Sequence, residues 1–322
     1  MRLSRSVTMF LCKLNLLIQF SHRIEFIFRQ TLRKVCRDLR NFIKDVKPDY
    51  HFTNISITLD PYSLDLTFNI SDDDRKKITA RYRNDGLNCY VSLVKPCGKN
   101  SEHLLNTNYI DCFSTDFAIA MSSQKTIVQQ FFFVNAWELH AKDLMRNVKS
   151  QNSLLKVTNS ELFTSEPSRI VDFLQLLDPN YLETIKISGD CFMNKLTKIT
   201  EICELEQFKK AKELEILSFF VTTPLEYFSH FEKVTVCYIS VNDEMLRSLK
   251  QMFITSPNLS SFSIQFSSYC DRDLISSCFG PPDEQLSNHD TSKWVMMIPG
   301  SDDVLLVEVK SSCVQFERKK NN

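Results

Sequence analysis

Glycine is scarce in this chain of 322 residues, which contains only five glycines. No two of them lie close enough in sequence to form the Gly-rich loop that cradles a phosphate group. This scarcity argues against P-loop and Rossmann-type nucleotide sites. The His-Glu-x-x-His motif of metalloproteases and the Gly-x-Ser-x-Gly motif of hydrolases are also missing. We therefore expect a protein that is not an enzyme, with no catalytic residues, no metal and no cofactor.

Paired cysteine motifs and an excess of charge are absent as well. The eleven cysteines include no Cys-x-x-Cys pair, and no histidine pair has zinc-finger spacing. Free thiols in an odd number are typical of a reducing compartment, so we expect a cytoplasmic or nuclear protein. The 39 basic residues equal the 39 acidic ones in number, which argues against a polyionic function of the whole chain.

A long apolar run is missing too. Val7–Phe20 is similar to the core of a signal peptide, but Lys13 and Asn15 interrupt it and no small-x-small cleavage site follows. Elsewhere the longest charge-free run, Thr126–Trp137, is shorter than the about 20 residues that a membrane-spanning helix needs. We therefore expect no membrane partner.

Basic residues are concentrated near the N-terminus, where residues 1–50 contain eleven Lys or Arg against four Asp or Glu. An apolar stripe with helical spacing runs through the same segment and ends before Pro48. Residues 1–48 are therefore predicted to form a separate helical module. The basic face of this helix is either solvated or, as an alternative, binds nucleic-acid phosphates, and the lack of interleaved aromatics favours solvation. The apolar stripe packs either on a partner or on residues 50–150.

Alternating apolar residues between 49 and 136 indicate β-strands. Four short strands of an antiparallel meander are expected at residues 55–59, 64–68, 78–82 and 89–93. The acidic run Asp72–Asp74 between two of them is either a solvent-exposed turn or part of a metal site. Because no further ligand follows at a recognisable spacing, the turn is the simpler interpretation.

A repeated unit follows at residues 137–270. Amphipathic segments with helical spacing lie between its apolar pairs, and one helix is expected to begin with a capping box from Ser240 to Asp243. One strand and one helix per repeat is the leucine-rich-repeat arrangement, although such pairs also arise by chance in a chain this hydrophobic. The apolar-x-apolar pairs begin at Leu155, Ile185, Leu214, Val234 and Phe262.

The C-terminal residues 271–322 begin with an acidic, proline-containing stretch that we expect to be an exposed loop, followed by closing strands at 294–298 and 304–309. The whole sequence predicts an α/β fold. Its parts are a helical N-terminus, a short antiparallel β-meander, an irregular leucine-rich-repeat-like curved β/α solenoid and the closing strands.

Two stretches resemble a known family. Thr31–Ile43 resembles the second half of an F-box from the nematode-expanded F-box family. Leu205–Ile216, together with Phe228–Val234, resembles the FTH domain that accompanies these F-boxes. The chain departs from the family pattern because no Leu-Pro pair begins the F-box and Gln19–Arg29 is extra sequence.

This resemblance implies a substrate-recognition subunit of a Skp/cullin/F-box ubiquitin ligase. Such a subunit binds a Skp-type adaptor, and through it cullin, with its F-box, and binds a target protein with its second domain. The adaptor-binding residues would be Leu14, Leu32, Val35, Cys36 and Leu39. Outward-facing residues on the repeat strands are the expected target contacts, namely Glu183, Lys186, Glu213, Glu215 and Thr235. The alternatives are a leucine-rich interaction scaffold without a ligase partner and the nucleic-acid-binding protein considered above.

Overall fold

The computed structural model describes residues 49–70, 77–86, 88–94, 101–135, 154–164, 168–189, 196–267, 272–287 and 291–320. The predicted helical module at 1–48 and the acidic run Asp72–Asp74 lie outside these described residues, so both stay predictions.

The chain divides into two compact units. One contains residues 1–51 and 119–126, and the other contains residues 52–118 and 127–322. In the described part of the first unit, the carboxylate of Asp49 accepts hydrogen bonds from the backbone N–H groups of Lys125 and Thr126, at 3.0 Å each. These bonds join the two segments of that unit.

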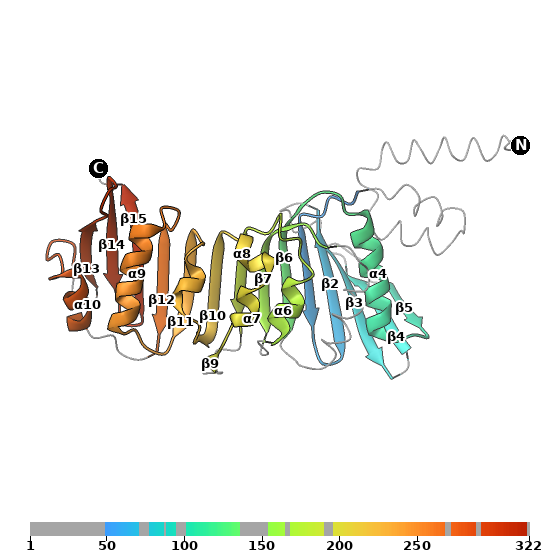
Figure 1. Cartoon of the computed structure of the whole chain (residues 1–322). Helices are drawn as coiled ribbons and strands as arrows, with labels where there is room; N and C mark the ends of the chain where they lie inside the picture. Colours follow the sequence, from blue (N-terminus) through green and yellow to red (C-terminus); the bar gives the residue numbers. More distant parts are fainter. Residues whose placement is uncertain are drawn as a thin grey trace, which may run out of the picture. The chain divides into compact units, whose positions relative to one another are not determined.

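The second unit is built on one mixed β-sheet with fifteen described strands (Figure 1). In chain order they are β1 (Asn54–Leu59), β2 (Ser63–Asn69), β3 (Lys77–Asp85), β4 (Asn88–Val94), β5 (Ser101–Leu105), β6 (Val128–Asn135), β7 (Val157–Thr164), β8 (Thr184–Ser188), β9 (Leu196–Thr197), β10 (Glu213–Val221), β11 (Lys233–Tyr238), β12 (Ser261–Phe266), β13 (Ser292–Met297), β14 (Asp303–Val309) and β15 (Cys313–Lys320). Across the sheet the order is β13-β14-β15-β12-β11-β10-β8-β7-β6-β1-β2-β3-β4-β5, with β9 beside β10.

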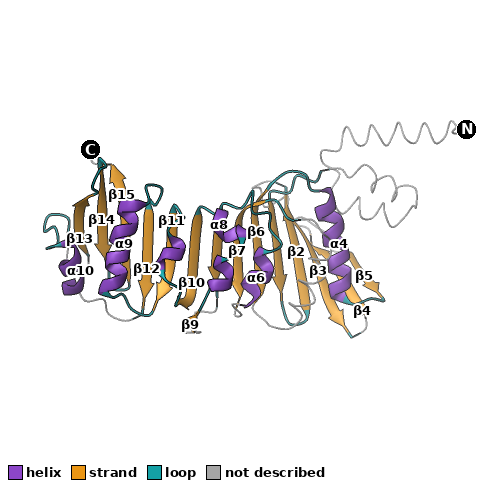
Figure 2. Cartoon of the chain, in the orientation of Figure 1, coloured by secondary structure: helices purple, strands orange, loops and turns teal. Residues whose placement is uncertain are grey.

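Helices connect the strands, and Figure 2 shows those of the second unit on one face of the sheet. The described helices are α4 (Tyr109–Ser123), α6 (Ser168–Leu174), α7 (Thr200–Cys203), α8 (Glu206–Lys210), the 3-10 helix η2 (Leu225–Phe228), α9 (Asp243–Thr255) and α10 (Arg272–Phe279). Among the described residues, no helix combines the length and the apolar character needed to cross a membrane.

The antiparallel meander predicted from the alternating pattern is confirmed. Strands β1 to β4 pair in sequence order, and each pair is antiparallel. Ile57 lies opposite Leu66, and Leu66 lies opposite Ala80, so apolar residues of successive strands share one face. On its other side, β1 pairs in parallel with β6.

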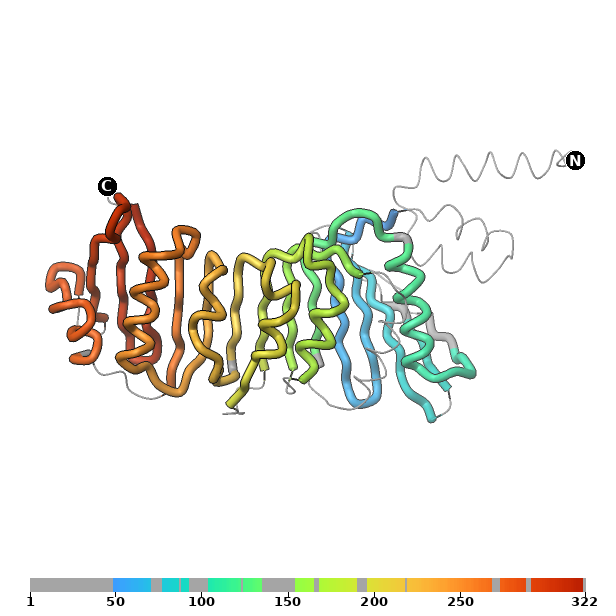
Figure 3. Tube along the Cα trace, in the orientation of Figure 1, coloured from blue at the N-terminus to red at the C-terminus, as the bar shows by residue number. Residues whose placement is uncertain are grey.

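The parallel strands expected in the repeat region are confirmed as well. Strands β6, β7, β8, β10, β11 and β12 pair in parallel, and the chain crosses them in sequence order, as the trace in Figure 3 shows. Four of the five predicted apolar pairs lie in β8, β10, β11 and β12. The first differs, because Leu155 precedes β7 and makes only an isolated bridge to Leu177.

The predicted fold class is wrong. The described strands do not form a meander joined to a separate leucine-rich-repeat-like solenoid; they form one continuous mixed sheet, and β-structure dominates. Two strands that the sequence analysis did not identify connect these parts into one sheet. Strand β6 joins the meander to the parallel strands, and β15 lies between β12 and β14. Local periodicity finds strands but carries no information on which distant strands pair, and this is the physical reason for the error.

The core lies between the sheet and its helices. Because side chains alternate between the two faces of a strand, every second residue points toward the helices and is buried. We call the opposite face, which no described helix covers, the open face (Figure 2). The buried residues include Ile57, Leu66, Phe133, Ile187, Ile216, Val236, Ile264, Leu305 and Phe316, each no more than 2% exposed.

Helix α9 is fixed at both ends by side chains. Asn242 is its N-cap, and its Oδ1 accepts a hydrogen bond from the backbone N–H of Met245 at 2.9 Å. The expected capping box from Ser240 to Asp243 is therefore wrong, because Asn242 and not Ser240 is the N-cap. At the C-terminal end, the guanidinium of Arg318 on β15 donates to the backbone carbonyls of Ser256 and Leu259, at 3.1 Å each, and also to that of Phe253. Strand β15 is thereby tied to the end of α9.

The C-terminal segment is more regular than expected. The two predicted closing strands are present as β13 and β14. Residues 272–279, which we expected to lie in an exposed loop, form helix α10 instead. Ile275 is fully buried and Phe279 packs against the ring of Phe316, at 5.9 Å between centroids. Packing of these apolar side chains stabilises a helix where the acidic sequence had predicted a loop.

Candidate target-binding face

Polar side chains stand in register on the open face of the parallel strands. Glu161 of β7, Lys186 of β8, Glu215 of β10 and Thr235 of β11 are successive cross-strand partners. A second row, two residues earlier on each strand, contains Asn159, Thr184, Glu213 and Lys233. Since neighbouring strands lie about 4.8 Å apart, the two rows form one compact polar surface.

Ion pairs cross the strands within this surface. Lys186 Nζ lies 3.3 Å from Glu215 Oε2, and Lys233 Nζ lies 2.6 Å from Glu213 Oε1. The hydrogen bond to Glu213 and the attraction of its charge raise the pKa of Lys233 above its usual value, so this ammonium stays charged at neutral pH. Exposed pairs of this kind contribute only about 0 to 1 kcal/mol to stability. These charges therefore contribute little to holding the sheet together.

A shallow hollow of about 290 Å³ lies within this surface over β6, β7 and β8 and reaches β10. Its outward-facing lining combines an aromatic ring with charged and neutral polar groups. These are Gln130, Phe132, Asn159, Glu161, Thr184, Lys186 and Glu213.

Residues 139–283 match the family model of the FTH domain. This chain contains an FTH domain. The matched residues include every described element from β7 to α10, and the two polar rows lie within them. The FTH part of the sequence resemblance is thus confirmed, while the F-box part stays a prediction.

Comparison with curated proteins and with solved structures identifies no close relative. No curated protein matches this chain. A Bacteroides fragilis protein whose crystal structure was solved as a structural genomics target has 10% sequence identity, with a TM-score of 0.32. The match covers 63% of this chain and 66% of that chain.

Four of the five predicted target-binding residues lie together in the two polar rows of the FTH domain. Lys186, Glu215 and Thr235 lie in one polar row, and Glu213 lies in the next. Glu183 precedes β8, and its Oε1 lies 2.8 Å from Lys212 Nζ. Lys186, Glu213, Glu215 and Thr235 share the open face because they alternate with buried apolar residues. Glu183 lies outside β8 and belongs to neither polar row. The role of all five in binding a target stays a prediction. The predicted adaptor-binding residues Leu14, Leu32, Val35, Cys36 and Leu39 lie outside the described residues.

Of the seven outward-facing residues that line the hollow, only Lys186 and Glu213 were predicted from the sequence, and two of the missed ones are informative. Phe132 belongs to the run Phe131–Phe133, in which alternation is invisible because both faces carry aromatic rings. Glu161 belongs to β7, whose inward-facing residues include the polar Ser160 and Thr164, at 2% and 0% exposure. The only local signal that Glu161 faces outward is its own charge, because its neighbours Ser160 and Leu162 are both buried.

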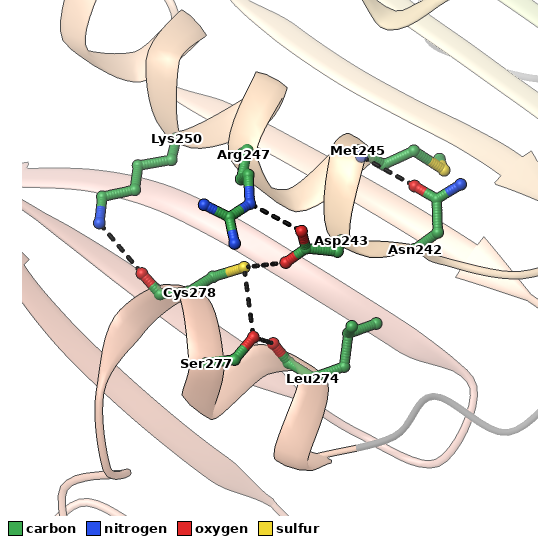
Figure 4. A network of polar contacts seen from close by, with 8 residues as sticks. All are labelled: Asn242, Asp243, Met245, Arg247, Lys250, Leu274, Ser277 and Cys278. Atoms are coloured by element: carbon green, nitrogen blue, oxygen red, sulfur yellow. Dashed lines mark hydrogen bonds and ion pairs between the residues drawn. The ribbon is translucent and has the colours of Figure 1, made fainter.

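A second polar cluster of the FTH domain joins α9 to α10 (Figure 4). The Cys278 thiol donates to Asp243 Oδ1 at 3.0 Å, and Arg247 Nε donates to Asp243 Oδ2 at 2.7 Å. Lys250 Nζ donates to the backbone carbonyl of Cys278 at 3.0 Å. Burial and the bond to Asp243 raise the pKa of Cys278, so the thiol stays protonated at neutral pH, unlike a nucleophilic cysteine. The cluster therefore acts as a clamp between two helices.

A second cysteine of the FTH domain, the buried Cys203, also has a shifted pKa. Burial raises the pKa of Cys203 to about 11, so this thiol is also protonated at neutral pH. Within the described residues, no group of three or more His, Cys, Asp or Glu side chains is arranged to hold a metal ion.

Proposed function

We propose that this protein is a substrate receptor of a Skp/cullin/F-box ubiquitin ligase. The FTH domain at residues 139–283 carries the proposal, because this domain is associated with F-box proteins. In this function residues 1–48 bind a Skp-type adaptor, and the open face of the FTH domain binds the target protein.

A receptor of this kind performs no chemistry itself. It holds a target near the ligase's conjugating enzyme, and the gain is an increase in effective concentration. The function requires a stable surface with distinctive charges and needs no nucleophile. The two polar rows on the open face supply such a surface, since the strands beneath them are fixed by buried apolar residues.

The adaptor side of the proposal is carried by the resemblance of Thr31–Ile43 to an F-box. A helix with an apolar stripe binds by laying that stripe into a groove of its partner. Val35 and Leu39 are one helical turn apart and fall on the stripe, whereas Lys34 and Arg37 fall on the opposite, basic side.

Co-purification of the full chain with a recombinant Skp-type adaptor tests the proposal. We expect the double variant Val35→Asp, Leu39→Asp to lose adaptor binding, because each buried apolar side chain contributes about 1.5 to 3 kcal/mol and an unpaired charge in the groove adds a penalty. The matched control, Lys34→Asp with Arg37→Asp, places the same charges on the basic side and should bind normally. Capture of the Val35 and Leu39 variant at the wild-type level would contradict the adaptor role.

A further inference from the structure

One carboxylate on the open face has no counter-charge. Glu161 is exposed and lies beside Lys186 in the polar row, but Lys186 is paired with Glu215 on its other side, at 3.3 Å. Lys233 is likewise occupied by Glu213. Within the described part of the chain, Glu161 makes no ion pair. The open face of β7 to β11 therefore has one uncompensated negative charge, and it lies at Glu161.

An aromatic ring stands next to this charge. Phe132 of β6 is the cross-strand partner of Glu161, and both side chains line the hollow. The ring is half-buried, so part of it faces the hollow. Asn159 and Thr184 supply neutral polar groups at the neighbouring positions, and the Nδ2 group of Asn159 is held by the backbone carbonyl of Gln129 at 2.9 Å.

A carboxylate beside an aromatic ring matches the chemistry of a guanidinium group. The carboxylate accepts two parallel hydrogen bonds from the planar fork, and the ring attracts the cation through its π-electrons. A lysine ammonium is a compact, strongly hydrated point charge, and it makes the same contacts less well.

We propose that the hollow binds an arginine side chain of the target, with Glu161 as the anionic partner and Phe132 as the aromatic one. This inference rests on the proposed function, because it assumes that the open face binds a protein segment. It adds the chemical class of the residue that is recognised and the two side chains that recognise it.

Selection of random peptides displayed on phage against the full chain tests this inference. We expect the enriched peptides to share an arginine. For a synthetic peptide with the enriched sequence, Glu161→Gln should weaken binding about tenfold or more, as expected for the loss of a charged hydrogen-bonded pair. Phe132→Leu should weaken it to a smaller extent, and replacing the arginine of the peptide by lysine should also reduce affinity.

Two further variants test whether the charge of Glu161 determines the selected residue: a charge reversal at Glu161 and a control at another carboxylate. Glu161→Arg should select peptides with Asp or Glu at the position where the wild type selects arginine. Glu317→Gln changes a carboxylate on the same sheet that already lies 3.2 Å from Lys319 Nζ, so it should leave peptide binding unchanged. Thermal melts of all variants verify that they fold.

The outcomes separate the inference from the proposed function. Enrichment of peptides without arginine, with affinity unchanged in Glu161→Gln, would overturn the inference and leave the open face as a target-binding surface. A selection that enriches no sequence would overturn both. The adaptor experiment with the Val35 and Leu39 variant is independent of the peptide selection. Its result therefore tests the adaptor role alone.

Discussion

Gly189 shows how one residue can limit the packing of the sheet. It follows β8, and a Cβ atom at this position would lie 2.6 Å from Phe219 Cζ and 2.8 Å from the backbone oxygen of Thr164. Phe219 and Thr164 are 1% and 0% exposed, so neither has room to move away. Any side chain at position 189 must therefore displace the core or the neighbouring strand.

We expect Gly189→Ala to destabilise the protein by about 1 to 3 kcal/mol, the usual cost of overpacking a well-filled core. Urea denaturation of the full chain measures this change. Adding Phe219→Leu removes the closest contact, so the double variant should lose less stability than the sum of the two single changes. Strict additivity of the two changes would show that the contact with Phe219 is not the cause.

At the scale of a strand, the structure separates residues that hold the sheet from residues that face solvent. Ile216 and Glu215 are neighbours on β10 and point to opposite faces. Ile216 is 1% exposed in the core, whereas Glu215 lies on the open face in a half-exposed pair with Lys186.

Truncation of these two side chains should have very different effects. Ile216→Ala is expected to cost about 2 to 5 kcal/mol, because it removes buried methyl groups and leaves a cavity. Glu215→Ala should cost at most about 1 kcal/mol, the upper range for an exposed ion pair. Urea titrations of the full chain measure both. A loss of stability in Glu215→Ala equal to that in Ile216→Ala would contradict the assignment of faces.

Alternation also explains which elements were predictable from the sequence. It identified β1 to β4 and the strands β8, β10, β11 and β12, because their inward-facing residues are apolar and most of their outward-facing residues are polar. It missed β6, where aromatic residues occupy both faces, and most of β7, where Ser160 and Thr164 face inward. Helix α10 was missed because its acidic and serine-rich sequence resembles a loop, whereas its contacts are with distant elements, including the ring of Phe316 and helix α9.

The candidate site was predictable in part for the same reason. Lys186, Glu213, Glu215 and Thr235 alternate with apolar residues, so their common face follows from the sequence. The pairing of Lys186 with Glu215, and hence the unpaired state of Glu161, depends on strand register, which local patterns do not determine.

At the scale of the whole second unit, the C-terminal strands complete the FTH domain rather than follow it. The antiparallel pairing of β15 with β12 covers what would otherwise be a free sheet edge. Arg318 of the same strand caps the C-terminus of α9. Residues well beyond position 283 therefore stabilise the matched domain.

A chain that ends at Ser267 is expected to lose its stable folded state, because it exposes the edge of β12 and removes the cap of α9. We expect a lower melting temperature by circular dichroism and association into larger species by size-exclusion chromatography. The full chain with Arg318→Ala should show a milder loss of stability without the association. A monomeric truncated chain with an unchanged melting temperature would contradict this role of the C-terminal strands.

The separation of the two faces of the sheet has a consequence for the evolution of this protein. Residues on the open face alternate with the core residues but share almost none of their packing. Substitutions at these outward positions can alter which partner is recognised at little cost in stability. A sheet of this construction can therefore acquire a new binding specificity one residue at a time, while the same buried framework persists.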